Sequence, residues 1–313
     1  MPKKGARETK VRYNLMFPMR AVKHWNRWYE GAGIGDVARL VEEAGFDAFS
    51  MSEHPYPDRE WLARGGHHAF DPFVSLSFAA AATTRIRLIT YILVSGYRNP
   101  YLTAKAAASF DLLSGGRFTL GTGAGYLKAE FEALGADFNR RGVLLDESIA
   151  AWKATWVGVD HAGPEFGVSD HVALPPPLTT GGPPIWIGGN GTAAQRRVVA
   201  VADGWMPMAA SGEMAAITRA RPLEDVETLA DWIAKVNKQR AEAGRDAADV
   251  AFVPFEADLL AGGDCAGFCA AVQPRLDNYA EAGVTWITIE PASRSFTDFR
   301  TDIDMLSSQL IHR

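Results

Sequence analysis

Two patterns of apolar residues alternate along this chain. Continuous apolar runs rich in β-branched residues, such as residues 86–94, are typical of strands that are covered on both faces. Segments in which apolar residues recur every three or four positions, such as residues 100–113, indicate helices with one buried side. A second apolar run begins at Arg117, so this part of the chain predicts one parallel strand–helix–strand unit.

The same alternation continues along the chain and predicts an α/β fold. Eight strands that alternate with helices are the pattern of a (β/α)8 TIM barrel. The alternative, an open doubly wound sheet, would carry a GxGxxG fingerprint after a strand, and none lies in that place. We expect a single domain over residues 1–313, with an insertion at about residues 158–183 that is rich in Pro and Gly and caps the barrel. The predicted strands cover residues 11–17, 46–51, 86–94, 117–120, 184–187, 204–208, 250–255 and 284–290.

Composition and charge exclude several classes of protein. The chain has 313 residues, of which 47% are hydrophobic, and a net charge of −5 with scattered basic residues, which argues against nucleic-acid binding. No apolar run approaches the ~20 residues that are needed to span a membrane. No apolar segment follows the basic residues 1–10, so we expect no signal peptide and a cytoplasmic protein.

The cysteines and histidines predict no metal site. Cys265 and Cys269 lie four positions apart on a predicted helix, a spacing that is poor for a disulfide. Two cysteines do not complete a metal site, so we expect two buried thiols in a reducing compartment. His67 and His68 are adjacent and point in opposite directions in an extended chain, so they do not chelate one metal well.

Glu53 and His54 follow the second predicted strand, at the end of the barrel where active sites are built. An imidazole titrates near neutral pH and can give or take a proton during a redox step. An adjacent carboxylate can orient the imidazole or raise its pKa. A surface pair or a structural hydrogen bond would give the same sequence pattern.

Two glycine clusters, GTGAG and GGNG, follow predicted strands at the same end of the barrel. Glycines also serve simple tight turns. Two clusters that each precede a helical pattern indicate instead that backbone N–H groups and a helix N-terminus hold an anion, such as a cofactor phosphate. The candidate phosphate-binding residues are Gly121, Thr122, Gly123, Ala124, Gly188, Gly189 and Asn190.

Several longer motifs carry a resemblance to a known family. They are GFDAFSMSEH at residues 45–54, TRIRL at 84–88, RNP at 98–100, LSGGR at 113–117, LGTGAG at 120–125, PPIWIGG at 183–189 and ADGW at 202–205. In this order, over about residues 11–210, they resemble the bacterial luciferase-like flavin and deazaflavin oxidoreductases. Within that family the sequence most resembles the branch that uses the deazaflavin coenzyme F420.

The resemblance implies a flavin-type ring at the carboxyl ends of the strands and, usually, a homodimer. It places a non-prolyl cis peptide at Tyr91-Ile92, in a bulge of the third strand behind the ring. Glu53 and His54 correspond to an acid–histidine pair of F420-dependent sugar-phosphate dehydrogenases. A glutamate that those enzymes carry after the fourth strand corresponds to Ala124, and this departure removes a proposed proton donor and argues against a sugar-phosphate substrate.

The sequence leaves three functional hypotheses open. The first is an F420-dependent oxidoreductase that transfers a hydride between the deazaflavin and a small organic substrate, with His54 managing the proton and Glu53 orienting His54. The second is an FMN-dependent monooxygenase that acts on an apolar substrate and receives reduced flavin from a separate reductase. The third is a non-catalytic flavin-binding protein. We expect residues 55–71 to shape the substrate pocket through Trp61, His67 and His68.

Overall fold

The structure is a computed structural model that describes residues 11–24, 28 and 33–312. Its centre is a barrel of parallel strands in the order β3-β2-β1-β9-β8-β7-β6-β5-β4, and β3 also pairs with β5, which closes the ring. β3 and β4 are two pieces of the third predicted strand, so the barrel has eight strand positions and the predicted TIM barrel is confirmed. The strands are β1 (Arg12–Met16), β2 (Ala48–Met51), β3 (Arg87–Thr90), β4 (Leu93–Val94), β5 (Phe118–Gly123), β6 (Ile185–Gly188), β7 (Gly204–Met206), β8 (Asp249–Phe252) and β9 (Trp286–Ile289).

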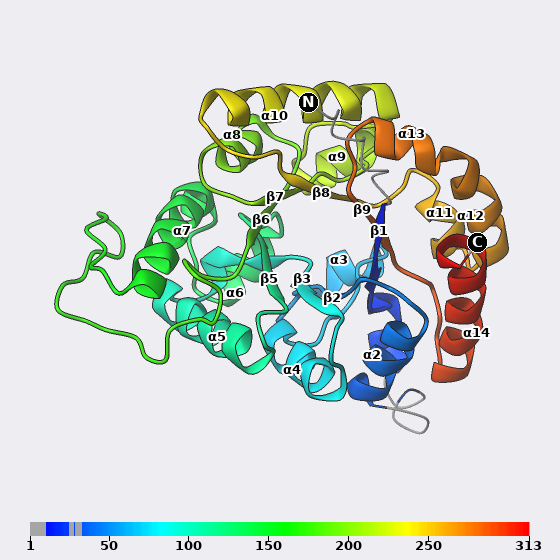
Figure 1. The fold of residues 1–313 in the computed structure, drawn as a ribbon, viewed down its shortest axis with the longest axis horizontal. Coiled ribbons are helices and arrows are strands. Elements are labelled where there is room, and N and C mark those ends of the chain that lie inside the picture. Colours follow the sequence, from blue (N-terminus) through cyan, green and yellow to red (C-terminus); the bar gives the residue numbers. More distant parts are fainter. Residues whose placement is uncertain (1–10, 25–27, 29–32, 313) are drawn as a thin grey trace, which may run out of the picture.

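Helices form a ring around the strands (Figure 1). Side chains satisfy backbone N–H groups at the start of several of them; the Asn99 side chain, for example, accepts a hydrogen bond from the Tyr101 N–H at 2.9 Å and begins α5 (Pro100–Leu113). The other helices of the ring are α2 (Ile34–Glu43), α4 (Pro72–Ala82), α7 (Arg141–Val157), α8 (Thr192–Ala200), α10 (Val226–Glu242), α12 (Cys265–Val272), α13 (Leu276–Glu281) and α14 (Phe296–Leu306). The short helices of the connections are α3 (Arg59–Ala63), α6 (Lys128–Ala133), α9 (Gly212–Thr218) and α11 (Ala257–Ala261), with short 3-10 turns η2 (Ser95–Tyr97) and η3 (Phe138–Arg140).

The third strand is interrupted by a cis peptide between Tyr91 and Ile92, as the family resemblance predicted. β3 precedes this bulge and pairs with both β2 and β5, whereas β4 follows it and pairs with β5. Tyr91 and Ile92 pack on an apolar cluster of buried residues that is separate from the main core. This cluster contains Ala48, Ile89, Trp186, Met206, Ala251 and Trp286. The bulge is therefore part of the barrel's own packing.

β5 extends to Gly123, three residues beyond the predicted strand end at Leu120. A Cβ atom at Gly121 would lie 2.0 Å from the carbonyl oxygen of Thr90, and one at Gly123 would lie 2.4 Å from Cδ1 of Ile92. Only glycine lets β5 pass so close to the bulge in the third strand. The prediction that the strand ends before these glycines is therefore wrong, because the glycines are what allows it to continue.

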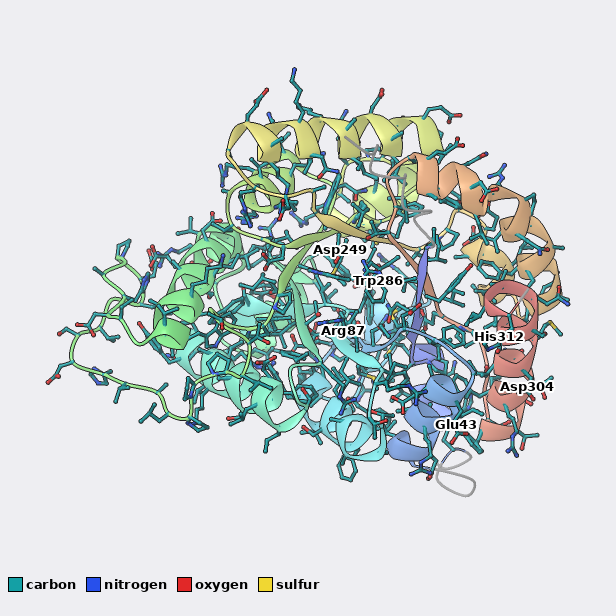
Figure 2. The ribbon with its side chains drawn as sticks, viewed as in Figure 1. Glu43, Arg87, Asp249, Trp286, Asp304 and His312 are labelled. Carbon is teal, nitrogen blue, oxygen red and sulfur yellow. The ribbon has the colours of Figure 1, made fainter. Side chains whose placement is uncertain are left out.

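The amino ends of the strands are closed by charged and aromatic side chains. Arg12 forms an ion pair with Asp249, and its guanidinium lies 4.1 Å from the centre of the Trp286 ring. Arg87 donates a hydrogen bond to Thr119 Oγ1 at 2.8 Å. Figure 2 shows Arg87, Asp249 and Trp286 together in the middle of the helix ring. This end of the barrel is filled, so the carboxyl ends of the strands are the place to look for a site.

The insertion at residues 158–183 loops out at the edge of the molecule, on the side of α5 and α7 (Figure 1). The Tyr101 hydroxyl of α5 donates a hydrogen bond to the carbonyl oxygen of Phe166 at 2.5 Å, and the Thr179 N–H donates to Asp111 at 2.7 Å. His161 Nε2 lies 3.0 Å from Glu147 Oε2 of α7. These contacts hold the segment against α5 and α7, and that it caps the barrel stays a prediction.

Both cysteines are buried free thiols, as predicted. Within the described part of the chain, no cluster of three or more acidic, histidine or cysteine side chains could hold a metal ion. None of the described helices is both long and apolar enough to cross a membrane. Residues 1–10, which bear on the signal-peptide prediction, lie outside the described residues.

Candidate active site

His54 lies just beyond the carboxyl end of β2, where sequence reasoning expected a catalytic group, and its side chain is 8% exposed. Its Nδ1 atom lies 3.1 Å from Oε2 of Glu130 on α6. Glu130 is completely buried. The carboxylate that contacts the imidazole is therefore 76 positions away in the sequence.

Glu130 also accepts hydrogen bonds from the Tyr97 hydroxyl at 2.9 Å and from the Tyr56 N–H at 2.9 Å. Burial, reinforced by the Glu130 charge, raises the pKa of Tyr97 far above its usual range, so Tyr97 acts as a donor. These two donors indicate that Glu130 acts as an acceptor. A carboxylate that accepts from Nδ1–H orients the ring and leaves Nε2 as the nitrogen that can exchange a proton with a substrate.

Sequence reasoning did not identify Glu130 as the partner of His54. A signal was present, because Glu130 follows Leu127 and precedes Leu134 at helical spacing and Phe131 is its neighbour. A carboxylate on the apolar side of a helix is unusual unless it is paired. The sequence does not show which side chain provides that pairing.

Aromatic side chains surround the imidazole. The ring centres of Trp61, His67 and Tyr126 lie 4.5, 4.9 and 6.1 Å from that of His54. Trp61 and His67 contact each other as well, with ring centres 5.4 Å apart. Of the three side chains predicted to line a substrate pocket, Trp61 and His67 are thus brought to His54. Among the described residues, no ring contact joins His68 to Trp61, His67 or His54.

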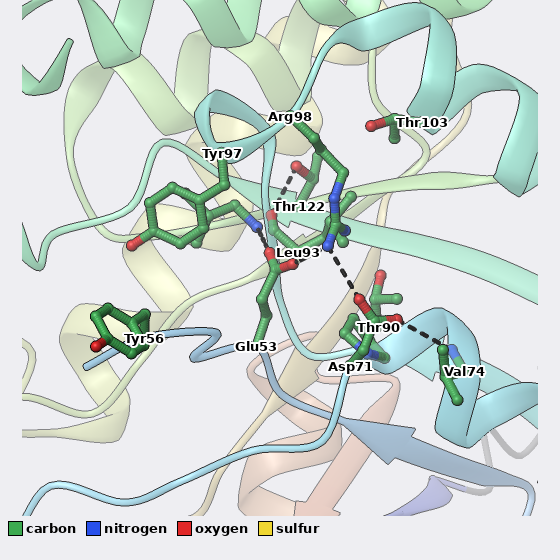
Figure 3. A network of polar contacts seen from close by, with 12 residues as sticks. Glu53, Tyr56, Asp71, Val74, Thr90, Leu93, Tyr97, Arg98, Thr103 and Thr122 are labelled. Atoms are coloured by element: carbon green, nitrogen blue, oxygen red, sulfur yellow. Dashed lines mark hydrogen bonds and ion pairs between the residues drawn. The ribbon is translucent and has the colours of Figure 1, made fainter. Parts of the chain in front are cut away.

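Glu53 points away from its neighbour His54 and holds the third strand instead. Its Oε2 accepts a hydrogen bond from the Val94 N–H of β4 at 2.6 Å, and its Oε1 lies 2.7 Å from Nη2 of Arg98. Arg98 also contacts Asp71 at 3.2 Å, and Figure 3 shows Arg98 reaching from Glu53 toward Asp71. The expectation that Glu53 orients His54 is wrong, because adjacent side chains in an extended segment point in opposite directions.

Glu53 makes the stability of the fold depend on pH. Burial raises the pKa of Glu53 from 4.5 to about 7, and the Arg98 charge and the Val94 N–H only partly oppose this. Between these two values the folded protein binds more protons than the unfolded chain, so the free energy of unfolding falls as the pH rises. Between pH 5 and pH 8 we expect the free energy of unfolding of wild type to fall by about 1–3 kcal/mol more than that of the Glu53→Gln variant. The amide in that variant cannot titrate.

Urea denaturation of both proteins at several pH values measures this difference. Glu60→Gln is the matched control, because Glu60 is an exposed carboxylate in an ion pair with Arg64. This variant retains Glu53, so we expect it to lose stability as wild type does over the same pH range. Parallel curves for wild type and Glu53→Gln would contradict the raised pKa of Glu53.

The two glycine clusters are placed at the rim of the barrel, but their backbone is partly used by the fold. Gly121 and Thr122 pair with β6, and Thr122 and Gly123 pair with β4. The Asn190 side chain donates to the carbonyl oxygens of Met208 and Arg221 at 2.7 and 2.8 Å. The backbone that extends past the strands begins at Ala124 on one side and at Gly189 on the other.

The corner after β6 fits an anionic group. Gly189 has a φ of +112°, and no atom lies within 4 Å of the place where a side chain at Gly191 would begin. Gly191 is the N-cap of α8, and no side chain of the described residues makes a capping hydrogen bond there, so N–H groups of the first turn are open to a ligand. These features are what a phosphate requires. The residues present therefore fit a cofactor that carries a phosphate.

Comparison with known proteins identifies the family. The sequence model of the luciferase-like monooxygenase family matches residues 29–257. An uncharacterised protein of Mycobacterium tuberculosis is 29% identical over 306 residues, which cover 88% of this chain and 92% of that protein. The F420-dependent glucose-6-phosphate dehydrogenase of Nocardia farcinica is 31% identical over 184 residues, which cover 56% of this chain and 53% of that enzyme.

Among solved structures, the monooxygenase RslO1 from Streptomyces bottropensis has a TM-score of 0.73 at 18% identity, and the match covers 96% of this chain and 99% of the other. At that identity the likeness concerns the fold. The family match, in contrast, rests on sequence and covers most of the chain. The chain therefore belongs to the luciferase-like monooxygenase family of oxidoreductases.

Proposed function

We propose that this protein is a coenzyme F420-dependent oxidoreductase that transfers a hydride between the deazaflavin and a small organic substrate. The observation that carries the proposal is the buried pair of His54 and Glu130, at the end of the barrel where the third strand bulges at Tyr91-Ile92. Glu53 connects the His54–Glu130 pair to the bulge. It precedes His54 in the sequence, and its side chain accepts a hydrogen bond from Val94 of β4, the strand that follows the bulge. The relative from Nocardia farcinica, described as F420-dependent, supports the choice of cofactor.

The proposed roles follow from the position of each group. Tyr91 and Ile92 would support the planar ring. The backbone from Gly121 to Ala124 and from Gly188 to Asn190 would contribute to the phosphate site, chiefly through Ala124 and the start of α8, because the Gly189 N–H already donates to Met206. The deazaflavin, when bound, supplies the hydride chemistry. His54 Nε2 would hold the proton that the substrate oxygen gains or loses, because Nδ1 is occupied by Glu130.

The rings around His54 have a separate role in the proposal. Trp61, His67 and Tyr126 are partly buried and cover the imidazole. Side chains of this kind exclude water and offer flat surfaces to an organic substrate. They would form the substrate pocket.

The second candidate is an FMN-dependent monooxygenase fed with reduced flavin by a separate reductase. It is favoured by the likeness of the fold to a solved monooxygenase and by the aromatic lining, which suits an apolar substrate. Both candidates use the same barrel end and the same phosphate corner. They differ in the cofactor that binds and in the use of oxygen.

A binding titration separates the candidates. Purified protein is titrated with F420, FMN and FAD, each in the oxidised and reduced state, and the affinity is read from cofactor fluorescence or absorbance. We expect F420 to bind at least tenfold more tightly than FMN. Tighter binding of reduced FMN, with oxygen consumption, would overturn the proposal in favour of the monooxygenase, and binding of neither would overturn both.

We also propose that the protein is a homodimer formed through α4 and α5. α4 carries no charged residue, yet Val74 and Phe78 on its outer side are largely exposed. Leu102 and Leu113 of the neighbouring helix α5 are exposed as well, and Leu113 is 85% exposed. Helices that are apolar on an outward face are typical of a subunit interface.

Phe78→Glu tests this interface. Burying a charge in an apolar interface is unfavourable, so we expect the variant to elute as a monomer in size-exclusion chromatography with light scattering, at protein concentrations where wild type is a dimer. Val143→Glu on α7 is the control, because Val143 is also an exposed apolar residue but lies on a different helix. If wild type is monomeric, or Phe78→Glu remains dimeric, the proposed interface is wrong.

A further inference from the structure

Two arginines share one aromatic ring at the rim of the barrel. The guanidinium carbon of Arg141, at the start of α7, lies 4.0 Å from the centre of the Phe138 ring. That of Arg219, just after α9, lies 5.0 Å from the same ring centre. The two positive charges are therefore at most 9.0 Å apart. Phe138 itself is buried, so the ring is a fixed platform for both side chains.

Neither guanidinium forms an ion pair with a carboxylate among the residues that the structure describes. Their neighbours differ in this respect, because Arg140 pairs with Glu165 and Arg197 with Asp146. Burial, and then the charge of Arg219, lowers the pKa of Arg141. Two like charges that are held close together without a counter-ion repel each other, and an anion between them would remove that repulsion.

Arg219 is the C-cap of α9, and its φ of +54° lies in the left-handed region in which many helices end. The end of α9 thus places the second guanidinium at Phe138.

Hydrogen bonds link the segments that carry both arginines to Asn190 and to α8. The Asn190 side chain donates to the carbonyl oxygen of Arg221, two positions after Arg219, at 2.8 Å. Arg197 of α8 donates to the carbonyl oxygen of Gly142, next to Arg141, at 2.8 Å. Asn190 lies in the corner that we propose for the cofactor phosphate, and Arg219 is open to solvent.

We propose that Arg141 and Arg219 bind carboxylates of an anionic tail that continues beyond the cofactor phosphate. This inference rests on the proposed function, because F420 carries a chain of glutamates beyond its phosphate whereas FMN ends at the phosphate. Guanidinium groups suit carboxylates, since they offer several N–H donors in a planar fork. The pair would make the protein prefer the tailed form of its cofactor.

The test compares two forms of F420 by fluorescence titration: F420 with its oligoglutamate tail, and the form that lacks all glutamates. The variant is Arg141→Gln with Arg219→Gln. We expect it to bind the tailed form about tenfold more weakly than wild type and the tail-less form within twofold, because each lost charged hydrogen bond weakens binding severalfold. The preference of wild type for the tailed form should also decline as salt is raised.

Two further variants complete the design. Arg39→Gln with Arg300→Gln makes the same change in net charge at exposed sites on α2 and α14, and should leave both affinities unchanged. Arg219→Gln alone is the fallback if the double variant does not fold, because the structure describes no hydrogen bond from the Arg219 side chain. We expect this single variant to bind the tailed form about threefold more weakly than wild type.

The outcomes separate the two proposals. Equal weakening of both forms, or no change in either, would overturn the tail site while F420 dependence stands. If wild type binds FMN and neither form of F420, then the cofactor proposal and the tail site both fail. A loss confined to the tailed form, absent from the charge-matched control, supports the tail site.

Discussion

Replacing His54 by alanine lowers the turnover number about 10²–10⁴-fold and leaves the affinity for the cofactor within about twofold of wild type. The imidazole sits at the carboxyl end of β2 with Nδ1 held by Glu130, so its loss removes the group proposed to handle the proton. Steady-state kinetics with the first alcohol or carbonyl compound that supports turnover measures the effect. Fluorescence titration of the cofactor measures whether binding is retained.

Two companion variants distinguish catalysis from packing. Glu130→Gln keeps the size of the side chain but not its charge, and should lower turnover about 10–100-fold, because the carboxylate that orients the His54 ring is lost. His68→Ala is the control, since His68 was a pocket candidate but makes no described ring contact with His54. Full turnover of His54→Ala with normal cofactor binding would remove the proposed role of the imidazole.

Gly121→Ala destabilises the barrel by about 2–4 kcal/mol, as overpacking of a rigid site does. The added Cβ atom would lie 2.0 Å from the carbonyl oxygen of Thr90 and 3.0 Å from the sulfur of Met206. The first of these is backbone next to the bulge, so β5 or the third strand has to shift. We therefore expect weaker cofactor binding as well as a lower midpoint of unfolding.

Gly212→Ala is the matched control for Gly121→Ala. No atom lies within 4 Å of a Cβ at Gly212, and its φ is not in the left-handed region, so alanine fits there without strain. Urea denaturation of both variants at one pH gives the comparison. A Gly121→Ala protein as stable as wild type would show that the close approach between β5 and Thr90 can relax, and the structural role assigned to this glycine would be withdrawn.

Local patterns in the sequence determined much of this fold. The buried apolar runs predicted all eight strand positions, because a strand covered on both faces needs side chains that prefer to leave water. The position of His54 at the active end of the barrel also followed from the chain itself, since every parallel strand ends at the same face. The cis peptide at Tyr91-Ile92 was found through family resemblance rather than through any local rule.

Other features were decided by tertiary structure. The partner of His54 is Glu130 on α6, and a contact across 76 positions leaves no periodic signal. Glu53 points away from its neighbour His54, and so it binds Val94 and Arg98 and fastens the third strand. The sequence alone determined which segments become strands and at which end of the barrel His54 lies. Which side chains meet there depends on long-range packing, because the pairing of buried polar groups is decided only when the barrel closes.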